Sequence, residues 1–324
     1  MRVKFVTYRM LDGSEKSLMK QIGDGRIIRL FDRTPFPEKS TDVVCPHFHE
    51  LVCVYGCPYN CAWCFIKGTF RFIQGTNGRI PVKVKKEKDI VRAIRTFLDA
   101  GLPPTVLNTG ELADSLCTEG QSFYGMAFSE YIMPFFEGSK HKILFLSKGT
   151  NVKHFLENSW QKNAVLSWSL NAYPVAERWE KLAPHPKERI EAARKVAEAG
   201  YEVRVRIDPM VAVENFEMYY RNLVGVLLDS VKPTRVTLGC LRGLVSTMSR
   251  AKDKSWIPYL KEKSSWGRKP PIETRFKLYS NIIDSLRGCG FYGDVGICKD
   301  TVALWSMLKS YGLSYPEIKC NCMW

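Results

Sequence analysis

The chain has 324 residues, of which 45% are hydrophobic, so it can bury a large core, and this excludes an intrinsically disordered protein. The formal net charge of +15 favours a polyanionic partner, and nucleic acid is the commonest such partner. No run approaches the roughly 20 apolar residues of a membrane helix. The first residues also lack a secretory signal. We therefore expect a cytoplasmic protein that makes no contact with a membrane.

Short apolar runs alternate with amphipathic segments from about residue 50 onward. Six runs predict strands, at 51–54, 105–108, 142–146, 164–170, 202–207 and 235–238. Helical spacing of apolar residues predicts helices at 89–98, 126–136, 187–199 and 216–228. Regular alternation of this kind predicts an α/β fold with a parallel sheet. Six units suit a partial (β/α)6 barrel, whose active site lies at the carboxyl ends of the strands, although a doubly wound open sheet gives the same pattern.

The remaining segments divide the chain into three regions. Residues 1–49 are expected to form an N-terminal extension, residues 50–242 the barrel core, and residues 243–324 a basic insertion followed by a C-terminal region. That last region begins with a polar stretch at 243–270. It continues with a helix, a short strand near 291–296, another helix and a tail that contains cysteines.

The cysteines are clustered, and their spacing predicts a metal centre. Cys57, Cys61 and Cys64 have gaps of three and two residues and follow the first predicted strand. Three thiolates on one loop can bind three corners of a [4Fe–4S] cluster. A structural zinc site or a chance grouping is the alternative, and Cys53 is a possible fourth ligand. Cys53 falls within the predicted strand, however, so we expect it to pack as a small apolar residue.

From roughly His49 to Arg242 the sequence resembles the spore photoproduct lyase family of radical-SAM enzymes. The resemblance is carried by HELVCVYGCPYNCAWCF at the cysteine loop, by FLSK ending at Lys148, by WSLN ending at Asn171, and by the segment up to Gly200. It implies that S-adenosylmethionine (SAM) chelates the open iron of the cluster and yields a 5′-deoxyadenosyl radical. It further implies a lyase that repairs a DNA photoproduct by C–C bond scission, supplied by a reducing electron donor of the flavodoxin or ferredoxin type.

The same resemblance assigns cofactor contacts to individual residues. Lys148 corresponds to the lysine that reaches the SAM carboxylate. Gly110 and Glu111, in the segment Asn-Thr-Gly-Glu, look like the element that binds the SAM ammonium. Ser169 and Asn171 correspond to contacts with the ribose or the carboxylate. Arg242 resembles a position that faces the substrate.

Two departures from the family concern the radical chemistry. The family carries a cysteine that donates a hydrogen atom after the second strand, whereas residues 109–114 contain none, and Phe65 stands where the family has tyrosine. Cys117 and Cys240 are the candidate donors that replace it, and a buried structural thiol is the alternative for each.

Several questions stay open at the level of sequence. Basic residues at 67–88 and at 249–271, the latter interleaved with Trp256, Tyr259 and Trp266, could bind phosphates and stack on bases, or form solvated loops. Cys298, Cys320 and Cys322 could bind a second cluster or zinc, present a thiol to the active site, or lie in a flexible tail. The alternative functions are radical-SAM chemistry on a peptide or small molecule, and a non-catalytic iron–sulfur protein that binds nucleic acid.

Overall fold

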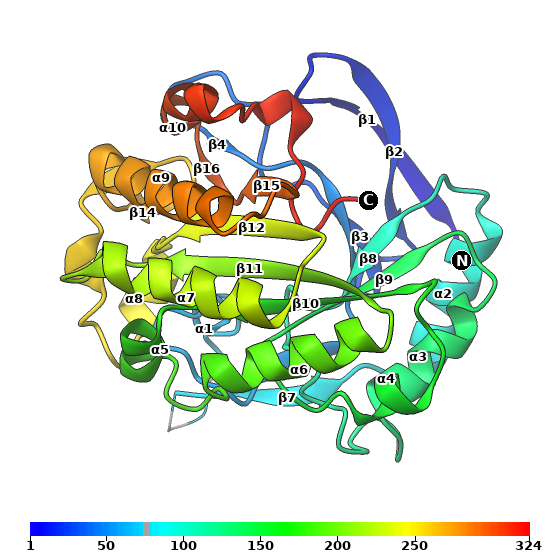
Figure 1. Ribbon diagram of the computed structural model, residues 1–324. Coiled ribbons are helices and arrows are strands. Elements are labelled where there is room, and N and C mark those ends of the chain that lie inside the picture. The colour runs from blue at the N-terminus through cyan, green and yellow to red at the C-terminus, as the bar shows by residue number, and fades with distance from the viewer. Residues whose placement is uncertain (74, 76–77) are drawn as a thin grey trace.

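A curved sheet forms the centre of the computed structural model, which describes residues 1–73, 75 and 78–324 (Figure 1). Among these residues ten strands pair in the order β1-β2-β3-β5-β8-β9-β10-β11-β12-β15. From β5 onward neighbouring strands are parallel. The parallel strands are β5 (Phe48–Leu51), β8 (Val106–Asn108), β9 (Lys142–Ser147), β10 (Ala164–Leu170), β11 (Glu202–Met210), β12 (Arg235–Cys240) and β15 (Asp294–Ile297).

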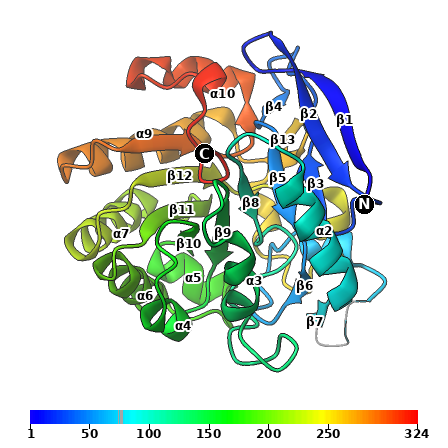
Figure 2. The same ribbon diagram turned by 90° about the vertical axis from the view of Figure 1, so that its right-hand side faces the viewer.

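The order of the parallel strands follows their order in the sequence, so the sheet is wound in one direction. Because such crossovers are right-handed, the connecting helices must all lie on the same face. Figure 2 shows them around the outside of the curved sheet. They are α2 (Glu87–Asp99), α3 (Phe128–Phe136), α4 (Lys153–Glu157), α6 (Pro186–Glu198), α7 (Phe216–Ser230) and α9 (Ile272–Gly288), whereas α5 (Tyr173–Trp179) follows β10 at the carboxyl ends of the strands. The predicted parallel α/β fold is confirmed as an open, partial barrel, and the doubly wound alternative is excluded.

The N-terminal residues extend this sheet. Strands β1 (Val3–Arg9), β2 (Glu15–Ile22) and β3 (Ile28–Phe31) are antiparallel and add to β5, while β4 (Val43–Val44) pairs with β16 (Asp300–Thr301). The three regions proposed from the sequence therefore share strands, and their boundaries stay a prediction.

The first parallel strand lies earlier than predicted. Strand β5 ends at Leu51, and the chain leaves the sheet before β6 (Val54–Cys57), which pairs with β7 (Ile80–Val84). Val52 and Cys53 are buried although they are not in a strand. The apolar run at 51–54 thus reflects the burial of these side chains and does not mark a single paired strand.

The polar stretch after β12 is a packed wall and not a solvated loop. It contains α8 (Val245–Arg250), the 3-10 turn Ile257–Tyr259 and the hairpin of β13 (Glu262–Ser264) and β14 (Gly267–Lys269). Helix α8 packs against α1 (Ile66–Thr69). The side chain of Trp256 is fully buried, and its indole N–H donates to Asp253 O, so Trp256 is not available to stack on a base, contrary to the expectation.

The C-terminal region returns to the sheet. After β15 come α10 (Val302–Met307) and two 3-10 turns, Leu308–Tyr311 and Tyr315–Glu317, and the last residues then enter the concave side of the sheet. Within the described part of the chain, no helix has both the length and the apolar character needed to cross a membrane.

Candidate active site

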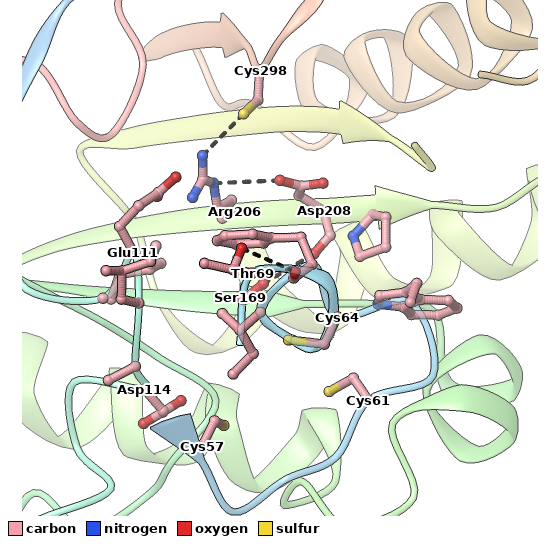
Figure 3. A pocket seen from close by; sticks show the side chains of 18 of the residues that line it. Cys57, Cys61, Cys64, Thr69, Glu111, Asp114, Ser169, Arg206, Asp208 and Cys298 are labelled. Atoms are coloured by element: carbon pink, nitrogen blue, oxygen red, sulfur yellow. Dashed lines mark hydrogen bonds and ion pairs between the residues drawn. The ribbon is translucent and has the colours of Figure 1, made fainter. Parts of the chain in front are cut away.

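A cavity of about 330 Å³ opens at the carboxyl ends of the parallel strands. Its walls come from the cysteine loop, from the ends of β8 to β12, from the β13–β14 hairpin and from the segment after β15. Figure 3 shows the three cysteines of the loop on one side of this cavity and charged residues of β11 on the other. The residues that line this cavity include Cys57, Cys61, Cys64, Gly110, Glu111, Asp114, Lys148, Ser169, Arg206, Asp208, Arg242, Trp266, Cys298 and Lys299.

The predicted cluster ligands lie together in the loop after β6. Cys57 ends that strand, and the backbone N–H of Cys64 donates to Cys61 O at 3.2 Å, which closes the loop. Burial raises the pKa of Cys57 and also that of Cys61, to about 12, so these thiols ionise only with a strong positive partner such as a metal. Cys53 does not line the cavity. Three thiols without a fourth suit the open corner of an iron–sulfur cluster better than a closed zinc site.

The three thiols are not grouped as ligands of a single ion. Among residues 1–73, 75 and 78–324, no three cysteine, histidine or acidic side chains stand close enough to hold one metal ion, and this includes Cys57, Cys61 and Cys64.

The β8 and β9 ends form a second wall of the cavity. A Cβ atom at Gly110 would lie 2.5 Å from the backbone oxygen of Leu146, so only glycine fits there. The carboxylate of Asp114 accepts from Ser147 Oγ at 2.5 Å and from the Lys148 backbone N–H at 2.6 Å. Asp114 also lies beside Cys57 (Figure 3). Sequence reasoning noted Asp114 only as part of the loop.

Lys148 is held in place by a buried ion-pair network. Its Nζ lies 3.1 Å from Glu180 Oε1 and donates to Ser169 Oγ at 3.0 Å. Glu180 is also paired with Arg189 at 2.7 Å, and both of these side chains are almost fully buried. Lys148 and Ser169 both line the cavity, and their contacts with SAM stay a prediction.

Asn171 lies away from the cavity. Its Nδ2 donates to Pro209 O at 2.8 Å, and its Oδ1 accepts from Tyr220 OH at 2.8 Å and from the Ala172 N–H. These bonds tie the end of β10 to β11 and α7. Asn171 does not line the cavity, because the chain turns into α5 directly after the strand, and its contact with a cofactor stays an untested prediction.

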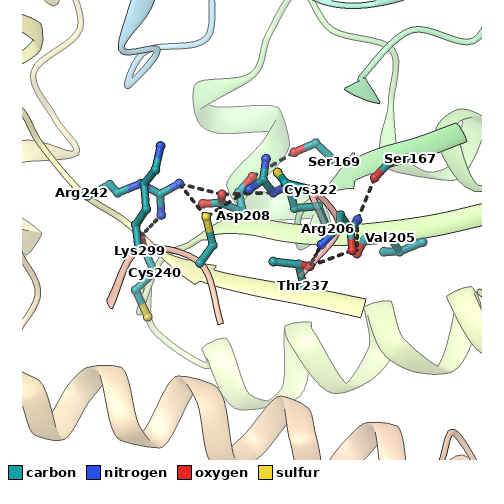
Figure 4. A network of polar contacts seen from close by, with 12 residues as sticks. Ser167, Ser169, Val205, Arg206, Asp208, Thr237, Cys240, Arg242, Lys299 and Cys322 are labelled. Carbon is teal, nitrogen blue, oxygen red and sulfur yellow. Dashed lines mark hydrogen bonds and ion pairs between the residues drawn. The ribbon is translucent and has the colours of Figure 1, made fainter. Parts of the chain in front are cut away.

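The two candidate hydrogen donors also lie outside the cavity. Cys240 is 1% exposed, and Figure 4 shows its side chain pointing away from the polar network. Its backbone N–H donates to Tyr279 OH on α9. Cys117 does not line the cavity either, and burial raises the pKa of its thiol. Besides the three cysteines of the loop, Cys298 lines the cavity, as in one of the alternatives that the sequence left open for Cys298, Cys320 and Cys322.

Opposite the cysteine loop is a charged wall. Arg242 Nη2 lies 2.7 Å from Asp208 Oδ2, and Arg206 Nε lies 3.7 Å from the same atom. Arg204, Arg206 and Asp208 alternate with apolar residues along β11, and this period-two pattern was the signal in the sequence for a polar barrel interior.

Glu111 belongs to this charged wall and not to the cysteine side. It pairs with Lys299 at 3.3 Å and lies toward Arg206 (Figure 3). Burial raises the pKa of Glu111, but Lys299 and Arg206 outweigh it, so the pKa lies below its ordinary value. Lys299 stacks over the rings of Phe31 and Trp266, at 4.2 and 5.1 Å from their centroids. Nothing in the local sequence marked Lys299, because its position depends on β15.

The model of the spore photoproduct lyase family matches residues 49–240, which is more than half of the chain. The chain belongs to this family. Spore photoproduct lyase of Clostridium acetobutylicum is 21% identical over 184 residues, covering 56% of this chain and 52% of the relative. That of Bacillus subtilis strain 168 is 26% identical over 181 residues, covering 56% and 51%. This chain thus spans about half the length of the curated relatives it matches.

Solved structures of spore photoproduct lyases share the fold. One, complexed with dinucleoside spore photoproduct, has a TM-score of 0.64 at 17% identity, covering 77% of this chain and 76% of that one. A mutant with bound AdoMet and the same dinucleoside has a TM-score of 0.63 at 17% identity, covering 76% and 75%. The predicted family membership is confirmed.

Proposed function

We propose that this chain is a radical-SAM enzyme that opens a dinucleotide photoproduct in DNA. The observation that carries the proposal is one cavity with three thiols of one loop on one side and a cationic wall on the other. Family membership supports the chemistry. The relatives of known structure bind AdoMet and a dinucleoside photoproduct, which are the two occupants that this cavity would take.

Cys57, Cys61 and Cys64 would hold a [4Fe–4S] cluster, with SAM beside it. When bound, cluster and SAM supply a reductive cleavage that delivers a radical able to abstract hydrogen, fed by a donor of the flavodoxin or ferredoxin type. Lys148, already fixed by Glu180 and Ser169, would orient the SAM carboxylate. Gly110 permits close approach to the backbone, and Asp114, beside Cys57, is better placed than Glu111 to accept from the SAM ammonium.

The charged wall would bind the substrate. Arg206 and Arg242 supply donors for a phosphate, and Phe31 and Trp266 supply aromatic surface for a base. Close in the chain to the lining residues Thr69 and Leu244, Phe72 is 82% exposed and Val245 is 75% exposed, and the helices α1 and α8 beside them pack together. Exposed apolar groups on one packed wall suit the gap that an extruded lesion leaves in DNA.

Product formation is the step where this chain departs from its family. Neither Cys117 nor Cys240 lines the cavity, so the two donors predicted from the sequence are not brought to the substrate side. We therefore propose opening of the lesion as the activity, without Cys117 or Cys240 as the hydrogen donor.

The test is anaerobic incubation of the cluster-loaded protein with SAM, dithionite and an oligonucleotide, either irradiated or not. Mass spectrometry then quantifies 5′-deoxyadenosine and thymine products. We expect deoxyadenosine from the wild type, lesion loss only with irradiated DNA, and neither from Cys61→Ala. Deoxyadenosine without any change in irradiated DNA would refute the substrate and move the search to peptides or small molecules. A full iron load that gives no deoxyadenosine would refute the reaction class.

A further inference from the structure

Four cysteines outside the proposed cluster site gather around a second, smaller cavity. Cys45 follows β4, Cys298 follows β15, and Cys320 and Cys322 are in the C-terminal tail. This cavity, about 10 Å³, adjoins the main one, since Glu111, Arg206 and Lys299 line both. Its size is about that of one ion or one water molecule.

The tail that carries two of these cysteines is fixed in the barrel. Asn321, 1% exposed, donates from Nδ2 to Ser167 Oγ at 2.8 Å and to Val205 O at 3.0 Å, and its Oδ1 accepts from Thr237 Oγ1 at 2.7 Å (Figure 4). The backbone N–H of Asn321 donates to the same hydroxyl at 2.8 Å. Bonds from three neighbouring strands hold the residue between the two cysteines, so the expectation of a flexible tail is wrong.

Further contacts hold the backbone of the tail. Arg204 donates to Asn321 O at 2.7 Å, and Arg235 donates to Cys320 O at 2.8 Å. A Cβ atom at Gly296 would lie 2.8 Å from the Cα of Cys320, so a glycine in β15 is required for the tail to pass. Several distant elements thus present Cys320 and Cys322 at one place.

Two of the four sulfur atoms accept from nitrogen donors. Arg206 Nη2 donates to Cys298 Sγ at 3.0 Å, Arg242 Nη2 lies 3.8 Å from the same sulfur, and Asn108 Nδ2 donates to Cys322 Sγ at 3.5 Å. Guanidinium groups aimed at Cys298 Sγ favour its thiolate over its thiol.

We propose that Cys45, Cys298, Cys320 and Cys322 form a second centre that binds a thiophilic metal through four thiolates. Zinc and a [4Fe–4S] cluster share this ligand chemistry, and each would give a centre of net charge near −2 with four thiolates. The cavity of about 10 Å³ has room for a zinc ion, whereas a cluster requires the lining side chains to move apart. Arg206, Arg242 and Lys299 are the cations that compensate it. The four sulfurs do not stand at the spacing of ligands around one ion among the described residues, so binding requires their side chains to rotate.

The proposal has a consequence for the main cavity. A sulfur that binds a metal is unavailable as a hydrogen donor, so Cys298 would not quench a substrate radical. The centre would instead form the floor beneath the substrate and set the charge that faces Arg206 and Glu111. It does not depend on the proposed reaction, because four thiolates bind metal whether or not SAM is cleaved.

Metal analysis of two variants tests this centre. The triple variant Cys57→Ala/Cys61→Ala/Cys64→Ala removes the first site and leaves the second intact. We expect it to keep about one zinc or about four irons per chain after anaerobic purification. In the same assay, Cys320→Ser/Cys322→Ser should lose that metal and keep the iron of the first site. Cys289→Ser is the matched control, because Cys289 is the exposed cysteine of this region.

Zinc alone in the triple variant indicates a zinc site, and iron with sulfide in that variant indicates a second cluster. Either result supports the proposal. The triple variant decides the question even if the double variant fails to fold. Less than about 0.2 metal per chain in the triple variant, with Cys45, Cys298, Cys320 and Cys322 reacting as free thiols or as a disulfide, would overturn it.

Discussion

Replacing Lys148 by methionine gives the sharpest test of the proposed SAM site. Methionine keeps the length and most of the apolar stem but removes the charge that lies 3.1 Å from Glu180 and 3.0 Å from Ser169. Glu180 is not left alone, because Arg189 remains 2.7 Å away. We therefore expect a loss of only about 1–2 kcal/mol in stability, below the 3–5 kcal/mol of an orphaned buried charge.

The effect on SAM binding should be larger than that on folding. A hydrogen bond to a charged group contributes about 1.5–3 kcal/mol, so the lost contact with the SAM carboxylate corresponds to roughly 10- to 150-fold weaker binding. Equilibrium dialysis with labelled SAM on cluster-loaded protein measures this, with iron content and melting temperature recorded in parallel. Lys153→Met is the control, because that side chain is 68% exposed. A SAM dissociation constant within twofold of wild type, at equal iron content, would refute the role of Lys148.

Three further predictions rest on single residues. Gly110→Ala places a Cβ 2.5 Å from a backbone oxygen and should cost about 1–3 kcal/mol of stability, whereas Gly120→Ala, where the same atom meets nothing, should be silent in thermal melts. Phe72→Ala, at a residue that is 82% exposed, should weaken binding of lesion-containing DNA about tenfold at constant salt while leaving SAM binding unchanged. An unchanged DNA affinity would show that Phe72 does not fill the gap left by an extruded lesion. Burial raises the pKa of Glu119 to about 7, so its neutral form favours the fold at low pH and this stability is lost as pH rises from about 4.5 to 7. Urea titrations should show a fall on the order of 2–3 kcal/mol over that window, and a slope that persists in Glu119→Gln would assign it to another group.

The sequence by itself determined the features that depend on short stretches of chain. Cys57, Cys61 and Cys64 are at most seven residues apart, so chain connectivity alone keeps them in one loop at one end of the sheet. Alternating strands and helices indicated a parallel sheet, whereas the strand order, which separates a barrel from a doubly wound sheet, came from the structure. The family resemblance singled out Lys148 and Ser169, and both line the cavity.

The tertiary structure decided what faces the cavity. Cys240 ends β12 and Asn171 follows β10, yet neither lines the cavity as Lys148 does, because orientation at a strand end depends on where the chain leaves the sheet. Trp256 looked exposed in a basic stretch but is buried under the packed wall. Cys45, Cys298 and Cys322 are brought together only because β4 pairs with β16, β15 lies beside β12, and Asn321 fixes the tail in the barrel. Contacts between segments so far apart leave no periodic signal in the sequence, since each segment meets only local requirements until the sheet is complete.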